Sequence, residues 1–160
     1  MGIEANFDMA SLEAYMQQKK RQLENLLRRN LNHLGMHCVV LARTLNTYQD
    51  QTANLRNSIG YVVVINGKIR DSFFKADERG KDFDPNGPKG EEVGEALAKK
   101  LAEEFTEGYA LIVVAGMNYA SYVEDVHHLD VLKPAETFAK SQINRVAKGI
   151  IEAMRRKEGL

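Results

Sequence analysis

The chain has 160 residues, with 22 Lys or Arg and 22 Asp or Glu residues, so its formal net charge is zero. This length favours one domain with its own hydrophobic core, and the zero charge argues against functions that need an overall basic excess, such as general nucleic-acid binding. The single cysteine, Cys38, excludes an internal disulfide and is typical of a reducing compartment. The N-terminus has no basic stretch before an apolar one, and no apolar run reaches the roughly 18 residues of a membrane span. We therefore expect a soluble cytoplasmic protein.

The first third of the chain has the spacing of one long amphipathic helix. We expect it over residues 10–46, after a flexible N-terminus of residues 1–10, and roughly 50 Å long if unbroken. Gly35 is a candidate kink. The polar half before Gly35 projects toward a neighbour, is partly disordered, or packs within its own chain. The apolar residues recur at steps of three and four and so share one face: Leu23, Leu26, Leu27, Leu31, Leu34, Cys38, Leu41, Ala42 and Leu45.

A polar segment, residues 48–58, reads as a loop, and a hairpin follows it. Ile59, Tyr61, Val63 and Ile65 alternate along a strand and so point to one face of a sheet. Asn66-Gly67 supplies the positive φ angles of a type I′ turn, which is the strongest local signal in the chain. Ile69 and Phe73 alternate on the return strand.

The middle and end of the chain predict two more helices and a further strand. Residues 77–90 are rich in Gly, Pro and Asp and indicate a loop. A helix starts near Pro88 or Gly90 and ends at Gly108, with Val93, Leu97, Leu101 and Phe105 as its apolar face. The strand 109–117 is apolar on both faces, so we expect it at the centre of the sheet. The last helix, 134–157, opens at Pro134 and has an apolar stripe of Phe138, Ile143, Val146, Ala147, Ile150 and Met154.

These elements predict an α+β fold in one domain over residues 1–160. It has a long N-terminal helix, an antiparallel or mixed sheet over residues 58–132 that contains the Asn-Gly hairpin and one middle helix, and a C-terminal helix packed on the sheet.

Three short elements occur in a distinctive order. Thr52-Ala53-Asn54-Leu55-Arg56-Asn57-Ser58-Ile59 leads into the hairpin, Asn118-Tyr119-Ala120-Ser121-Tyr122-Val123-Glu124 follows the predicted central strand, and Val131-Leu132-Lys133-Pro134-Ala135 opens the last helix. Together they resemble the head–tail joining, or tail-completion, family of long-tailed, lambdoid-type bacteriophages, over roughly residues 10–155. One departure is Asp125-Val126-His127-His128, where the family pattern often has an aromatic residue and a glycine.

The resemblance implies a structural protein at the neck of a virion. Such a protein forms homo-oligomeric rings between the portal or connector and the tail tube or tail terminator, needs no cofactor and no metal, and catalyses no reaction. The residue types agree with contact surfaces, because Tyr offers a large area with a polar tip and Arg beside Leu offers an anchored cation. The candidate interaction residues are Leu55, Arg56, Ser58, Tyr119, Tyr122, Val123 and Glu124.

Two other classes of function stay open. His127 and His128 with the nearby acids suggest a small metal-dependent hydrolase, although adjacent histidines in a strand point to opposite faces. The pair His33 and His37 has helical metal-binding spacing. The acids of residues 77–84 lack the alternating ligands of a calcium loop, and Cys38 lies on the apolar stripe, which favours a core cysteine over a nucleophile. A generic adaptor that binds a partner through the N-terminal helix is the remaining alternative.

Overall fold

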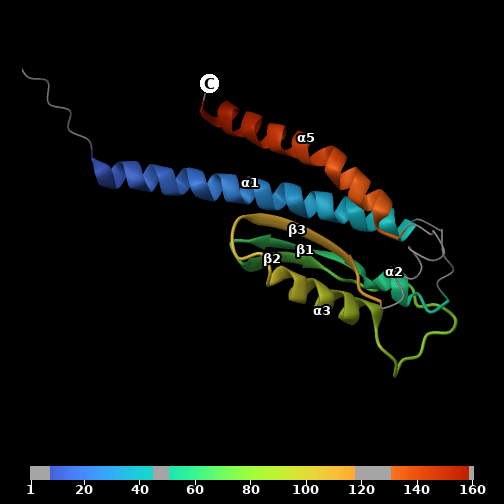
Figure 1. Cartoon of the computed structure of the whole chain (residues 1–160). Helices are drawn as coiled ribbons and strands as arrows, with labels where there is room; N and C mark the ends of the chain where they lie inside the picture. Colours follow the sequence, from blue (N-terminus) through green and yellow to red (C-terminus); the bar gives the residue numbers. More distant parts are fainter. Residues whose placement is uncertain (1–7, 45–50, 118–130, 159–160) are drawn as a thin grey trace, which may run out of the picture.

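A computed structural model describes residues 8–44, 51–117 and 131–158. It has the predicted α+β fold, with a long N-terminal helix, a three-stranded antiparallel sheet and further helices (Figure 1). None of the helices in these ranges combines the length and the hydropathy that crossing a membrane requires. The elements in chain order are α1 (Met9–Thr44), α2 (Asn54–Ser58), β1 (Ile59–Ile65), β2 (Lys68–Phe73), α3 (Gly90–Ala102), β3 (Tyr109–Ala115) and α5 (Lys133–Glu158).

The sheet has the order β2-β1-β3, with β1 antiparallel to both neighbours. The Asn66-Gly67 hairpin is confirmed, with φ angles of 49° and 75° at the two turn residues. The prediction that residues 109–117 form the central strand is wrong, because β1 occupies that position. β3 is apolar on both sides because helices cover both faces of the sheet, α1 on one and α3 on the other (Figure 1).

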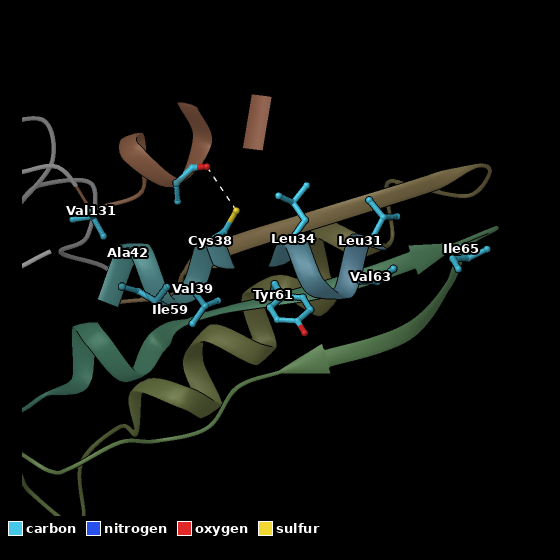
Figure 2. Close-up of a cluster of buried hydrophobic side chains, with 11 residues drawn as sticks. Leu31, Leu34, Cys38, Val39, Ala42, Ile59, Tyr61, Val63, Ile65 and Val131 are labelled. Carbon is cyan, nitrogen blue, oxygen red and sulfur yellow. Dashed lines mark hydrogen bonds between the residues drawn. The ribbon is translucent and has the colours of Figure 1, made fainter. Parts of the chain in front are cut away.

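The main core lies between the sheet and α1. Leu31, Leu34, Cys38 and Val39 of α1 meet the alternating Ile59, Tyr61, Val63 and Ile65 of β1, the residues predicted to share a face (Figure 2). Val131, just before α5, and Ala135 in its first turn complete this core. Cys38 is fully buried, which confirms it as a core residue.

Gly35 does not break α1, which runs continuously for 36 residues. The helix therefore has no break at Gly35. A Cβ atom at Gly35 would lie 2.6 Å from Tyr61 Cδ2 and 2.9 Å from Leu111 Cδ1. Glycine is needed here because it lets the helix backbone approach the sheet closely. The predicted start of the helix is close to the observed one, and the Asp8 carboxylate accepts a hydrogen bond from Ala10 N at 3.1 Å.

The smaller core lies on the other face of the sheet, under α3. Val62 and Val64 of β1 meet Ala98 and Ala102 of α3. The buried face of α3 consists of small residues spaced by four, Gly90, Gly94, Ala98 and Ala102. The predicted apolar residues Val93, Leu97 and Leu101 flank this face and are half-buried, and Phe105 lies beyond the helix end and is exposed.

α5 lies alongside α1 on the side away from the sheet, runs in the opposite direction and ends short of the N-terminal end of α1 (Figure 1). Of its predicted stripe, Ile150 is buried and Phe138, Val146 and Met154 are half-buried. Ile143 and Ala147 are exposed, which corrects their expected place in the core. The predicted apolar stripe is wider than the buried surface of α5, because only the side of α5 that faces α1 is covered.

Candidate interaction surfaces

The first of the three family-like elements builds the interior of the chain. The loop expected over residues 48–58 is partly helical, because α2 turns at Asn54–Ser58 after Ala53, which has a φ angle of 61°. The Leu55 side chain is 2% exposed and Ser58 is fully buried. Arg56 is half-buried. The interaction role predicted for these three residues stays a prediction, and the structure gives Leu55 and Ser58 an intrachain role.

Ser58 joins the beginning of the sheet to its end. Its hydroxyl donates to Leu55 O at 2.8 Å and accepts from Gly116 N at 3.0 Å and Met117 N at 3.3 Å. A Cβ atom at Gly94 would lie 2.2 Å from Ser58 O. Ser58 therefore lies where the backbones of α2, α3 and the end of β3 approach one another closely.

Asn54 makes a second connection at the same crossing. Its amide nitrogen donates to Pro88 O at 3.1 Å, and its amide oxygen accepts from Gly90 N at 3.3 Å. These bonds fix the start of α3 against α2, because Asn54 is largely buried and its polar atoms need partners inside the protein.

Arg43 is a buried cation that sequence reasoning missed. Its guanidinium donates to Ile59 O at 2.7 Å and 3.2 Å, to Lys75 O at 2.9 Å and to Asp77 Oδ2 at 3.0 Å. It ties the last turn of α1 to the start of β1 and to the segment after β2. No local sequence pattern predicts this role, since an arginine in the last turn of a helix is ordinarily explained by the helix dipole.

The other predicted contact residues, Tyr119, Tyr122, Val123 and Glu124, lie outside the described residues, as do His127 and His128. Their interaction or metal-binding roles stay predictions. His33 and His37 stack edge to face with ring centroids 4.6 Å apart. They border a groove of about 470 Å³ between α1 and α5, together with Leu34, Phe138, Arg145 and Val146. Within residues 8–44, 51–117 and 131–158, no three His, Cys, Asp or Glu side chains gather as a metal site would require.

The chemistry of Cys38 agrees with its position. Its thiol packs in the core and contacts Ala135 O at 3.7 Å. Burial raises the pKa of the Cys38 thiol above its ordinary value, because the thiolate is disfavoured away from water. The residue is therefore poorly suited to nucleophilic chemistry.

The N-terminal part of α1 carries several exposed apolar side chains. We call residues 9–20 the arm. It extends past the sheet and past the end of α5 (Figure 1). Met9, Leu12 and Met16 are 61%, 48% and 61% exposed, and Tyr15 is half exposed. Met9, Leu12 and Met16 are spaced by three and four, so they share one side of the helix.

No protein-family model, curated protein or solved structure matches this chain.

Proposed function

We propose that this chain is a structural assembly protein of a tailed phage or prophage, which joins the head connector to the tail through oligomeric protein–protein contacts. Two observations support the proposal. The order of three short sequence elements resembles the tail-completion family, and the arm presents apolar side chains to solvent.

The arm is the observation that carries the proposal. A helix that serves only its own core has its apolar residues covered by that core. The arm instead extends past the sheet and past α5 (Figure 1), and its Met9, Leu12 and Met16 side chains are exposed. Covering such side chains on a partner removes apolar surface from water and contributes roughly 1–2 kcal/mol each. Methionine also adapts its shape to a partner surface. The arm therefore fits a contact that forms during assembly.

The same arm fits a generic adaptor protein, so the test must read out particle joining. Phage heads and tails produced without this chain are mixed with purified wild-type protein or with the variant Leu12→Gln/Met16→Gln, and joined particles are counted by electron microscopy. Glutamine is a good helix former, so the helix is preserved while the apolar side is lost. We expect wild-type protein to restore joined particles and the variant to restore few.

The matched control is Ala10→Gln/Ala14→Gln, which changes two exposed positions of the same arm away from the Leu12 and Met16 side. It should join particles as the wild type does. Efficient joining by the Leu12→Gln/Met16→Gln variant would remove the arm from the mechanism. Failure of wild-type protein to join heads to tails would contradict the proposed function and favour the adaptor.

A further inference from the structure

The charges of this neutral chain are separated between the two sides of its sheet. On one side, α1 has six Lys or Arg against two Asp or Glu, and residues 133–156 of α5 again have six against two, so each helix has a surplus of four positive charges. On the other side, residues 90–107, α3 with the turn after it, have six Glu against two Lys, a surplus of four negative charges. α5 and α3 form opposite sides of the molecule (Figure 1).

The outer face of α5 presents charge in three clusters along the helix. Arg145 and Lys148 come first, Glu152 follows, and Arg155 and Arg156 come last. All five residues are exposed. They share the side of α5 opposite the buried Ile150, because their spacing keeps them within about a quarter to a third of the helix circumference.

The outer face of α3 presents the opposite pattern at similar spacing. Glu92 and the half-buried Glu95 come first, Lys99 and Lys100 follow, and Glu103 and Glu104 come last, in the turn directly after the helix. The order of charge clusters is thus positive–negative–positive along α5 and negative–positive–negative along α3. When the two helices are aligned in parallel, the centres of successive clusters differ by less than about one residue, or 1.5 Å.

We propose that copies of this chain associate head to tail, with the outer face of α5 on one copy against the outer face of α3 on the next. The inference rests on the proposed assembly function and specifies the contact between subunits. In this register Arg145 and Lys148 face Glu92 and Glu95, and the arginines at 155 and 156 face the glutamates at 103 and 104. Because the two faces differ and lie on opposite sides, the contact is heterologous and builds a ring or an open stack rather than a two-fold dimer.

Existing surface pairs do not oppose this contact. Lys89 Nζ lies 3.1 Å from Glu92 Oε1, and Lys99 Nζ lies 2.8 Å from Glu95 Oε1. Exposed pairs within one helix contribute little, so exchanging them for pairs across subunits is inexpensive. The charges select the partner and the register. Ile151 on α5 and Phe105 after α3, both exposed, supply apolar surface beside the charged faces.

The test is a charge exchange followed by sedimentation velocity of the full chain. Wild-type protein should associate at about 0.05 M salt and dissociate at about 0.5 M, where screening is strong. The α5 variant Lys148→Glu/Arg155→Glu and the α3 variant Glu92→Lys/Glu103→Lys should each associate at least about tenfold more weakly. Mixing the two variants, or combining all four changes in one chain, should restore association, because opposite charges face each other again.

The control Arg29→Glu/Lys68→Glu reverses two exposed cations on neither face and should associate as the wild type does. Circular dichroism of each variant separates a lost contact from a lost fold. Three results would overturn the inference: wild-type protein that stays monomeric at low salt, variants that associate normally, or folded variants that do not recover when mixed. The proposed function has its own readout, because head–tail joining by wild-type protein would survive any of these results.

Discussion

The substitution Gly35→Ala tests how closely α1 presses on the sheet. In an exposed helix interior, alanine is more favourable than glycine by about 1 kcal/mol. At Gly35 the new methyl group would lie 2.6 and 2.7 Å from two ring carbons of Tyr61 and 2.9 Å from Leu111 Cδ1. Relieving such overpacking in a core costs about 1–3 kcal/mol. The Tyr61 ring has little freedom to move, because its hydroxyl donates to Asn32 and the ring stacks on Phe73. We expect a net loss of up to about 2 kcal/mol of unfolding free energy.

The same substitution in α5 provides the control. Gly149 lies inside that helix, and a Cβ atom there would meet nothing within 4 Å. Gly149→Ala should therefore raise the unfolding free energy by about 0.5–1 kcal/mol. Urea unfolding followed by circular dichroism measures both variants. If Gly35→Ala stabilises the protein as much as Gly149→Ala does, the close approach of α1 to Tyr61 is wrong.

Three further predictions follow from buried or bonded groups. Arg43→Met should lower the unfolding free energy in urea titrations by about 3 kcal/mol, since buried carbonyls lose their charged donor. Arg28→Met, which removes an exposed ion pair between Arg28 Nε and Asp71 Oδ2 at 2.7 Å, should lower it less, and equal losses would contradict the role of Arg43. The hydrogen bond from Arg79 holds the pKa of Glu91 below its ordinary value, so this pair stabilises the fold above the ordinary glutamate pKa, and its contribution disappears as the pH falls through the lowered pKa. Glu91→Gln should therefore be destabilising at pH 7 and nearly neutral at lower pH. A difference in thermal midpoint between this variant and the wild type that does not depend on pH would refute the prediction. Cys38 should react with a thiol reagent such as DTNB only after urea unfolds the chain, and rapid labelling of the native protein would show that its burial is wrong.

The sequence predicted the elements whose signals are local. The Asn66-Gly67 turn requires particular backbone angles, and the alternating apolar residues from Ile59 to Ile65 require one covered face, so the hairpin follows from the chain itself. The long first helix follows from its period of three and four. The sequence also contains a signal for the central position of β1, because Val62 and Val64 make the other face of that strand apolar as well.

Other features depend on contacts between distant segments. Gly35 reads as a possible kink, and only its distance to Tyr61 identifies it as a point of close approach. A buried Arg43 cannot be distinguished in sequence from a solvent-exposed arginine at a helix end. The small-residue face of α3 is visible in the sequence as four Gly or Ala residues spaced by four from Gly90. The larger apolar residues beside it form a stronger pattern and so predict a different buried face.

The same difference applies to the candidate surfaces. The short motif predicts Leu55 and Ser58 as contact residues, whereas the structure buries both side chains, and Ser58 lies at a close approach to the backbone of α3. The exposed side of the arm could be identified only from the fold, because the sequence alone does not tell where α5 ends relative to α1. The opposite charges of α5 and α3 likewise became a pattern only when the two helices were placed on opposite sides of the sheet.

The proposal that this protein joins heads to tails is tested most directly by locating the chain in finished particles. Tailed particles from a strain that encodes it can be labelled with gold-conjugated antibody against the purified protein and imaged by electron microscopy. We predict label at the junction between head and tail, and none on isolated heads or tails that lack a neck. Particles that are complete and infectious yet contain none of this chain would contradict the proposed function.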